Sequence, residues 1–440
     1  MLVIGGGPAG SATAARLARQ GRRVVMLEKD HHPRFHIGES LLPHSMPLLD
    51  QLGVLDEVHE SVGVLKPGVD FYSDHHVNPH QAYYFDSAWD KRYPHAYEVR
   101  RSDFDRILFK NAERAGAEVH EGVRVTSIEF RPGKPSLVRA RGEDGEEVAW
   151  ETRFVVDASG RDTFLSGRLG LKRKNKKHAS SAIYGHFHNV PRQPGDDEGN
   201  ICVYWFEHGW FWLIPLRDGI MSVGAVCFPE YLKTRDCPPE EFLYKTLAIS
   251  PSLAERMKAA ELEGEVRATG NFTYFSSTAS GEGCLLVGDA FAFLDPVFSS
   301  GVHLALTGAF MAADTVDRIL EHPGQARQLT RTYERKLRRG MRRFSWYIYR
   351  FNTPAFHHLF MSPSNRFRMI EAITSMLAGD VFRRPRMGRS ILVFRVIYYG
   401  FSILNWRKSF AVWRRRRHQL GLEFKGGTTP VDKAVEGAHR

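Results

Sequence analysis

The stretch LVIGGGPAGSATAARLARQGRRVVMLEKD, residues 2–30, joins two apolar runs through a glycine-rich turn and an alanine-rich segment. Residues 2–5 have the pattern of a buried strand, residues 8–20 that of a helix and residues 23–28 that of a second strand. The sequence therefore predicts a β-turn-α-β unit, which is the building block of doubly wound nucleotide-binding sheets.

The turn has the spacing GxGxxG, which is typical of dinucleotide sites. Gly5 permits the tight turn, Gly7 lets the backbone approach a pyrophosphate, and Gly10 lets helix and strand pack closely. Pro8 and Ala9 complete the motif at the start of the helix, whose free N–H groups favour phosphate binding. An ordinary glycine-rich turn is the alternative, but the strand before it and the helix after it favour a nucleotide.

An acidic residue follows at the expected distance. Glu28 ends the second strand about 20 residues later, where a carboxylate accepts hydrogen bonds from the ribose. The sequence contains no second GxGxxG, so a stably bound nicotinamide cofactor is not indicated.

Three later segments distinguish between NAD and FAD. DASG (residues 157–160), LLVGDAFAFLDP (residues 285–296) and VRRSDFD (residues 99–105) resemble segments of two-domain FAD enzymes such as hydroxybenzoate hydroxylases and geranylgeranyl reductases. The resemblance covers most of residues 1–320 and implies FAD as cofactor, with Asp289 on the ribityl chain and Arg101 in contact with the flavin. FHIGESLLP, residues 35–43, is similar to the segment that lines the flavin in these enzymes.

This family resemblance implies a set of cofactor-binding residues along the chain. They are Gly5, Gly7, Pro8, Ala9, Gly10, Glu28, Lys29, Gly38, Glu39, Ser40, Arg101, Val125, Asp157, Gly288, Asp289, Pro296, Gly301 and Val302.

Two motifs narrow the resemblance to flavin-dependent halogenases. In GWFWLIP, Trp210, Trp212, Ile214 and Pro215 match the family pattern WxWxIP at every fixed position. Aromatic residues at every second position of a strand are usually core. That interpretation explains the aromatic residues but not their agreement with the family pattern.

The second motif, FLDPVFSSG at residues 293–301, resembles the halogenase segment FxxPxxSxG. It precedes a predicted helix from Val302, so the backbone N–H groups at Ser299, Ser300 and Gly301 suit a halide or a flavin carbonyl. A plain helix N-cap at either serine is compatible with this. Phe298 departs from the tryptophan halogenases, which carry glutamate there, so free tryptophan is not the expected substrate.

Lys66 is the candidate catalytic residue. It lies in Lys66-Pro67-Gly68, which resembles the K-x-G segment of flavin halogenases. In that family, reduced FAD, O2 and halide yield hypohalous acid, which travels to the lysine and halogenates an electron-rich aromatic ring. A lysine suits this role because it carries three donors and its pKa falls on desolvation. The alternative is an ordinary solvated loop lysine.

We therefore expect a halogenase that uses chloride or bromide and FADH2 from a separate flavin reductase, acting on a phenol, pyrrole or indole. One rival is a flavin-dependent hydroxylase or a geranylgeranyl-reductase-like enzyme. A rival of another class is a non-catalytic flavin-binding adaptor whose basic tail contacts nucleic acid or membrane.

The predicted fold is an α/β FAD-binding domain with an inserted antiparallel β-sheet substrate domain. Besides the first unit, the sequence predicts helices at residues 104–115 and 302–320 and strands at residues 153–157 and 284–287. Residues 181–228 repeat short runs rich in Tyr, Phe, Trp and Val between Gly, Pro and Asp, which predicts an antiparallel sheet. We assign residues 1–60, 97–170 and 275–325 to the FAD-binding domain and residues 61–96 and 171–274 to the substrate domain. Residues 326–424 form a basic helical region, and residues 425–440 a flexible tail.

The composition limits the cellular compartment and the kinds of site to be expected. The four cysteines show no CxxC pair and no metal-ligand spacing, so we expect a reduced, cytoplasmic chain without a metal site. The opening residues predict a strand rather than a signal peptide, and no apolar run is long enough to span a bilayer.

The net charge of +11 comes from the C-terminal part of the chain. Residues 327–418 contain 22 Lys and Arg against three acidic residues. Helices that pack one apolar face on the core and leave arginines in water are the simplest interpretation. Docking of an acidic acyl or peptidyl carrier protein, peripheral membrane contact and nonspecific nucleic-acid contact stay open, while specific nucleic-acid binding is not expected.

Overall fold

The structure, a computed structural model, describes all 440 residues except 271–272, 384–386, 408–409, 411–413 and 415–440. Two compact units divide the chain. Unit 1 consists of residues 1–63, 99–174 and 274–343, and unit 2 of residues 64–98, 175–273 and those from 344 onward. The predicted tail, residues 425–440, lies outside the described residues.

The C-terminal region does not form a unit of its own, in contrast to the predicted division. Helix α10 (Ala326–Ile348) belongs to unit 1 up to Arg343 and to unit 2 from Phe344. The positive charge of the C-terminal region distinguishes it in the sequence, but the contacts within the fold divide the region between the two units.

Unit 1 is built on a six-stranded sheet in which every neighbouring pair is parallel except β19 and β20. The order is β19 (Ser280–Gly281), β20 (Cys284–Leu286), β11 (Val155–Asp157), β1 (Leu2–Ile4), β2 (Val25–Leu27) and β7 (Glu118–His120). The predicted strands at residues 2–5, 23–28, 153–157 and 284–287 are confirmed with slightly shorter bounds. Their apolar side chains are buried, as parallel strands covered on both faces require.

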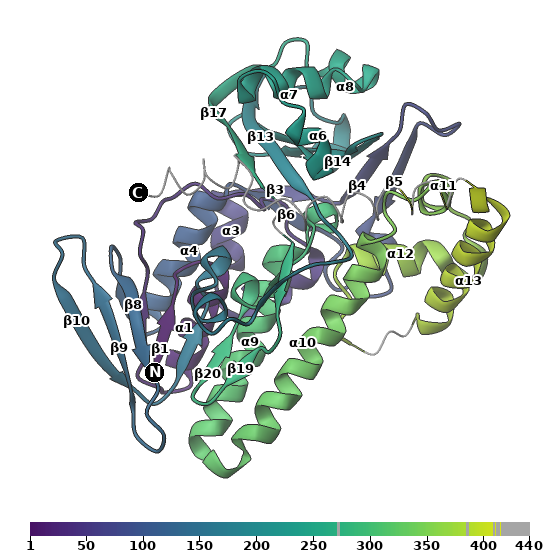
Figure 1. The fold of residues 1–440 in the computed structure, drawn as a ribbon. Coiled ribbons are helices and arrows are strands. Elements are labelled where there is room, and N and C mark those ends of the chain that lie inside the picture. Colours follow the sequence, from purple (N-terminus) through teal and green to yellow (C-terminus); the bar gives the residue numbers. More distant parts are fainter. Residues whose placement is uncertain (271–272, 384–386, 408–409, 411–413, 415–440) are drawn as a thin grey trace. The chain divides into compact units, whose positions relative to one another are not determined.

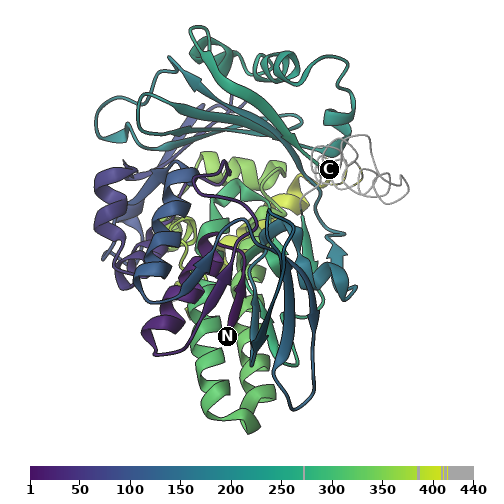
Figure 2. The same cartoon turned by 90° about the vertical axis from the view of Figure 1, so that its left-hand side faces the viewer.

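Three helices pack around this sheet: α1 (Pro8–Arg19), α4 (Arg101–Arg114) and α9 (Ser300–Glu321). Helix α1 lies against both of the others, because its alanines allow close approach. Figures 1 and 2 show α9 beside the first part of α10, with the three-stranded sheet of β8 to β10 at one side of unit 1. The predicted helices at residues 8–20, 104–115 and 302–320 are confirmed.

The smaller elements of unit 1 connect these layers. The remaining helices are α2 (Met46–Gln51), α3 (Leu55–Ser61) and α5 (Phe164–Arg168). One small sheet has the order β10 (Glu147–Thr152), β9 (Ser136–Arg141), β8 (Arg124–Glu129), and another β12 (Lys172–Lys174), β18 (Tyr274–Ser276), β21 (Ala292–Phe293).

Unit 2 contains a seven-stranded sheet. Its order is β17 (Glu261–Thr269), β13 (Ser181–His188), β16 (Met221–Cys227), β15 (Gly209–Pro215), β14 (Ile201–Phe206), β4 (Gly68–Tyr72) and β5 (His80–Tyr84). The predicted antiparallel pairing is found everywhere except between β14 and β4, which are parallel. At this pair, a strand of residues 175–273 meets a strand of the earlier segment, residues 64–98. A two-stranded sheet pairs β3 (Gly63–Lys66) with β6 (Ala96–Val99).

The two faces of the large sheet bury different side chains. On one face Phe211 and Leu213 join a core cluster with Phe242 and Leu253, which come from α7 (Pro239–Leu247) and α8 (Pro251–Arg256). The other face carries the tryptophans of β15 together with Trp205, which stacks on Phe351 at 4.5 Å. The remaining helices of unit 2 are α6 (Pro229–Lys233), α11 (Pro354–Met361), α12 (Met369–Leu377) and α13 (Gly388–Leu404).

Helix α10 shows the packing predicted for the basic region. Tyr333, Leu337, Met341, Phe344 and Ile348 are buried along one face at helical spacing. Among the described residues, no helix is long and apolar enough to cross a membrane, and no group of three His, Cys, Asp or Glu side chains is arranged to hold a metal ion.

The tryptophan face of the sheet depends on a glycine in the neighbouring strand. A Cβ atom at Gly224 would lie 2.3 Å from the Trp212 ring and 2.6 Å from the Cβ of Tyr184. We expect Gly224→Ala to lower the free energy of unfolding by about 1–3 kcal/mol or more, because the site is already full. Thermal unfolding measures the effect. The control Gly400→Ala, where nothing lies within 4 Å, should be neutral or slightly stabilising; equal midpoints for both variants would contradict the packing.

Candidate active site

The predicted nucleotide turn has the geometry that its glycines require. Gly5 has φ +97°, and a Cβ there would lie 2.5 Å from the carbonyl oxygen of Ala158. At Gly10 a Cβ would lie 1.8 Å from the carbonyl oxygen of Gly5, so helix and turn touch through their backbones. Helix α1 begins at Pro8 with no acidic residue in its first turn, so its N-terminal dipole suits an anion.

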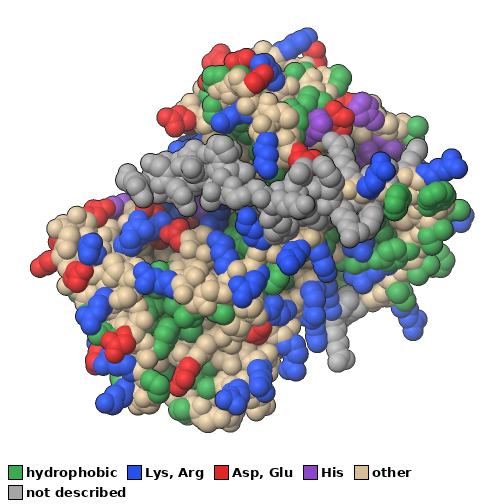
Figure 3. All heavy atoms as spheres, viewed as in Figure 1, with side chains coloured by type: hydrophobic (Ala, Val, Ile, Leu, Met, Phe, Trp, Pro, Cys, Tyr) green, Lys and Arg blue, Asp and Glu red, His purple; other side chains and the backbone are tan. Residues whose placement is uncertain are grey.

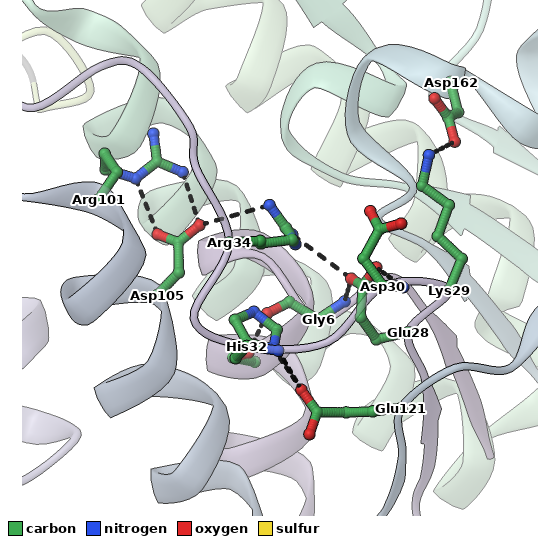
Figure 4. A network of polar contacts seen from close by, with 11 residues as sticks. Gly6, Glu28, Lys29, Asp30, His32, Arg34, Arg101, Asp105, Glu121 and Asp162 are labelled. Atoms are coloured by element: carbon green, nitrogen blue, oxygen red, sulfur yellow. Dashed lines mark hydrogen bonds and ion pairs between the residues drawn. The ribbon is translucent and has the colours of Figure 1, made fainter. Parts of the chain in front are cut away.

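Glu28 anchors this turn from the end of β2, as Figure 4 shows. Its Oε2 accepts a 2.6 Å hydrogen bond from the Gly6 amide and its Oε1 a 3.0 Å bond from the Asp30 amide. A carboxylate oxygen can accept more than one hydrogen bond, so a ribose hydroxyl can still be accommodated. Lys29 turns to Asp162 in a 2.6 Å ion pair.

Arg34 is a cation at this turn that no sequence motif predicted. Its Nη2 lies 3.5 Å from Oε2 of Glu28, and it is the group nearest to the position of a Cβ on Gly7, at 3.7 Å. Its Nη1 lies 4.0 Å from Oδ2 of Asp105. A guanidinium in this position would suit a phosphate-bearing ligand.

Arg101 is held by a second carboxylate. It forms a bidentate pair with Asp105, with distances of 2.8 and 2.9 Å, and its Nη1 donates a 2.6 Å bond to the carbonyl oxygen of Ile37. Burial opposes the charge, but Asp105, Asp289 and Glu39 raise the pKa of Arg101, so the guanidinium stays charged. Asp105 therefore fixes the orientation of the arginine beside the loop that contains Gly38.

The two aspartates predicted at the cofactor differ in their surroundings. Asp157 accepts bonds from the amides of Ser159 and Leu165, at 3.0 and 2.8 Å, and thus holds the turn that passes Gly5. Asp289 follows β20, and burial raises its pKa to about 6, against the pull of Arg161 and Arg101. A carboxyl group that is disfavoured as an anion suits hydrogen bonding to a neutral polyol.

The N-terminus of α9 is shaped as the motif implied. Ser299 has φ +52°, and its amide donates a 2.7 Å bond to the carbonyl oxygen of Pro296. Neither a side-chain cap nor an acidic residue occupies the first turn of this helix. A Cβ on Gly301 would meet nothing within 4 Å. Ser299 therefore occupies the predicted N-cap position, but its side chain makes no capping hydrogen bond, and open space lies beside Gly301 at this end of the helix dipole.

The remaining predicted cofactor residues also belong to unit 1. Glu39 and Ser40 are buried after Gly38, and the carbonyl oxygen of Glu39 accepts a 2.8 Å bond from the Val99 amide. Val125 is buried on β8 in the three-stranded sheet. Gly288 begins the turn after β20, Pro296 the turn before α9, and Val302 lies in the first turn of that helix.

Lys66 lies in unit 2 at the end of β3, and it is not a solvated loop residue. Its side chain has 0% exposure, and its Nζ lies 3.6 Å from Oε1 of Glu98 on β6, which is equally buried. The same Nζ lies 5.5 Å from the centre of the Phe85 ring. Burial lowers the pKa of Lys66, while Glu98 raises it in opposition.

The WxWxIP residues also lie in unit 2. Trp210 and Trp212 are buried on one face of β15, with ring centres 5.9 Å apart, and Ile214 and Pro215 end the strand. The Nε1 of Trp212 donates a 3.1 Å bond to Ser222. The predicted same-face arrangement is thus present, and the side chains have the burial of a core.

Glu98, Arg34 and the role of Asp105 were not predicted from the sequence motifs. A signal existed for two of them: Glu98 is the single acid in the apolar stretch of residues 96–99, and Asp105 stands four residues after Arg101, which is the spacing of a pair on one helix face. Arg34 has no local signal, because its neighbours at the turn come from other segments.

Comparison with known proteins defines the class. Residues 1–344 match the family model described as an FAD binding domain, so this is an FAD-binding protein. The fold resembles the structure of a myxobacterial chondrochloren halogenase with a TM-score of 0.74 and 31% identity, over 88% of this chain and 98% of that one.

Two curated relatives extend the match. A 1H-pyrrole-2-carbonyl-[peptidyl-carrier protein] chlorinase of Pseudomonas fluorescens is 30% identical over 88% of this chain and 90% of its own. A tryptophan 2-halogenase of Chondromyces crocatus is 36% identical over 76% of this chain. The chain spans 64% of the length of that relative, and 64% of an Armillaria mellea halogenase. The chain belongs to the flavin-dependent halogenase family.

The environment of Asp289 gives a pH-dependent prediction. Because its folded-state pKa is raised to about 6, the flavin-free protein loses stability as the pH rises from the unfolded value of 3.8, and the loss is complete once the pH exceeds about 6; near pH 4 it is small. Asp289→Asn should raise the free energy of unfolding at pH 8 by about 1–2 kcal/mol and have little effect at pH 4. Thermal unfolding at the two pH values measures this; a loss of stability at pH 8 would show that the charged form is favoured.

Proposed function

We propose that this chain is a halogenase that uses reduced FAD, O2 and chloride or bromide to halogenate an electron-rich aromatic ring. The observation that carries the proposal is the buried Lys66–Glu98 pair, because an ordinary loop lysine would be in water. Family membership and the WxWxIP strand support it.

The described residues of unit 1 fit FAD. The glycine turn and the N-terminus of α1 would hold the pyrophosphate, Glu28 the ribose, and Asp289 the ribityl chain. The N-terminus of α9, with Ser299, Ser300 and Gly301, would receive halide or the flavin ring. When bound, the reduced flavin supplies the two electrons that convert O2 and halide into hypohalous acid.

Lys66 would act on that hypohalous acid. Its ammonium donates a hydrogen bond to the oxygen, which makes the halogen more electrophilic. The ring carbon attacks the halogen, the oxygen–halogen bond breaks, and the oxygen leaves as water with a proton from Lys66. The proton lost from the ring carbon restores the ammonium, so ring and hypohalous acid give halogenated ring and water. Glu98 would keep the buried ammonium charged.

Substrate and partners follow from chemistry and from the relatives. Phe298 stands where tryptophan halogenases carry glutamate, so a phenol or pyrrole is the proposed substrate. The name of one relative specifies a pyrrole on a carrier protein, and the name of another specifies tryptophan. A substrate panel should therefore contain free and carrier-bound aromatic compounds. A separate reductase would supply FADH2. The four cysteines are free thiols, which suits the cytoplasm.

The first experiment is halogenation by purified protein with FAD, a flavin reductase, NADH, air and bromide or chloride. Phenols, indoles and pyrroles, free and carrier-bound, are analysed by mass spectrometry. Lys66→Ala should reduce halogenated product about a hundredfold or more, because positioned proton donors contribute about 10²–10⁴-fold.

The control is Lys174→Ala, an exposed lysine in unit 1, which should leave product formation unchanged. Hypohalous acid, measured with a chemical trap, should still form in both variants. Full halogenation by Lys66→Ala would remove the lysine from the mechanism, and hydroxylated product from the wild-type protein would make it a monooxygenase.

The pH profile tests the role of Glu98. Burial already lowers the pKa of Lys66 and Glu98 opposes this, so Glu98→Gln should lower it further. If the ammonium is the active form, activity falls as the pH rises through this pKa. The alkaline limb of the kcat/KM profile should therefore move to lower pH in Glu98→Gln and return toward wild type in Glu98→Asp. Unmoved limbs would give Glu98 a purely structural role.

A further inference from the structure

Helix α13 in unit 2 has two apolar sides, and only one of them is covered. Ser390, Phe394 and Tyr398 form its buried side, and α13 packs against α11 and α12. The opposite side carries Leu392, Val396, Tyr399 and Ile403, which are exposed to 62%, 63%, 47% and 71%. We call these four residues the outer row. Their spacing of four, three and four residues places them on one stripe of the helix.

Large apolar side chains continue beyond the outer row. Leu404 is exposed to 80%, Trp406 to 60% and Phe410 to 53%. Figure 3 shows hydrophobic side chains gathered over α13 with Lys and Arg side chains among them. Contiguous apolar surface of this kind is uncommon on soluble proteins and marks a contact site.

The sequence around α13 carries charge of one sign. Residues 381–422 contain 11 Lys and Arg and no Asp or Glu. Arg389 and Arg395 stand three residues before and after Leu392, so they flank the stripe on opposite sides. The guanidinium of Arg350 donates a 2.8 Å bond to the Tyr399 hydroxyl. The contact partner must therefore accept apolar side chains at its centre and cations around them.

We propose that the outer row of α13 docks on the surface of an anionic phospholipid bilayer. The aliphatic side chains enter the boundary of headgroups and acyl chains, and the exposed Arg389 reaches the lipid phosphates, while the guanidinium of Arg395 lies 4.6 Å from the centre of the Trp346 ring. Tyr399 and Trp406 suit this depth, because an aromatic ring with one polar atom favours the membrane interface. The contact is peripheral, since no described helix can cross the bilayer.

Other occupants fit the surface less well. A second copy of the chain would bring two dense sets of arginines together, and their repulsion opposes such a contact. An acidic protein would satisfy the charge, but protein interfaces also carry about one hydrogen bond per 100–200 Å², and Leu392, Val396 and Ile403 offer no side-chain donor or acceptor. A lipid surface requires only the apolar contact and the charge.

Vesicle flotation of the full-length, FAD-loaded protein tests the proposal. The wild type should float with phosphatidylcholine–phosphatidylglycerol vesicles and not with vesicles of phosphatidylcholine alone. The double variant Val396→Gln/Ile403→Gln should lose about tenfold or more in vesicle affinity. Arg389→Gln should weaken binding to the mixed vesicles severalfold, and added salt should have the same effect.

The matched control is Val148→Gln/Leu169→Gln, which removes two exposed apolar side chains of unit 1, 41% and 51% exposed, and should bind vesicles like the wild type. Thermal unfolding checks that all variants are folded. Absence of vesicle binding by the wild type, or equal binding by the outer-row variant, overturns the proposal. If the wild type does not bind vesicles but forms a dimer or captures an acidic carrier protein, and the outer-row variant loses that ability, the row contacts a protein and the membrane proposal is wrong. None of these outcomes depends on whether the protein halogenates.

Discussion

The hydrogen bond from the Gly6 amide to the Glu28 carboxylate, 2.6 Å long, ties the first turn of the chain to the end of the second strand. The backbone contact of Gly10 with Gly5 fixes the start of α1 against the same turn. Together they place the helix N-terminus, a carboxylate and the guanidinium of Arg34 around one small volume. The proposed FAD site of unit 1 would depend on this constraint, because a Cβ or a misplaced helix would fill the space that a pyrophosphate needs at such a turn.

Much of unit 1 could be predicted from the sequence because its signals are local. The glycine turn, the apolar strands and the alanine-rich helix can each be recognised within a dozen residues. Asp157 and Asp289 stand directly at or after such apolar strands, so their positions could be predicted as well. The aromatic alternation of residues 181–228 likewise predicted four strands of unit 2, β13 to β16. What it could not predict was the parallel pairing of β14 with β4, which joins distant segments.

The surroundings of Lys66 also could not be predicted from the residues next to it in the sequence. Residues 63–71 show a lysine between turn formers, which predicts water around its ammonium. Its burial follows from the pairing of β3 with β6, and its carboxylate partner arrives from the distant strand. In the same way, both sides of α13 are apolar in the sequence, and only the packing of α11 and α12 decides which side is covered.

Each unit is assembled from three separate stretches of chain, interleaved with those of the other. The central strand β1 pairs with β2 and β11, and β11 in turn with β20, so the sheet of unit 1 is incomplete until residue 286 has been synthesised. Unit 2 is completed later in synthesis, since it includes residues beyond 344. A nascent chain therefore carries open strand edges through most of its synthesis, which makes late folding and chaperone dependence the natural expectation. It also means that no single cut of the gene yields a self-contained half, so exchanging the unit 2 sheet between relatives requires at least two segments to be replaced together.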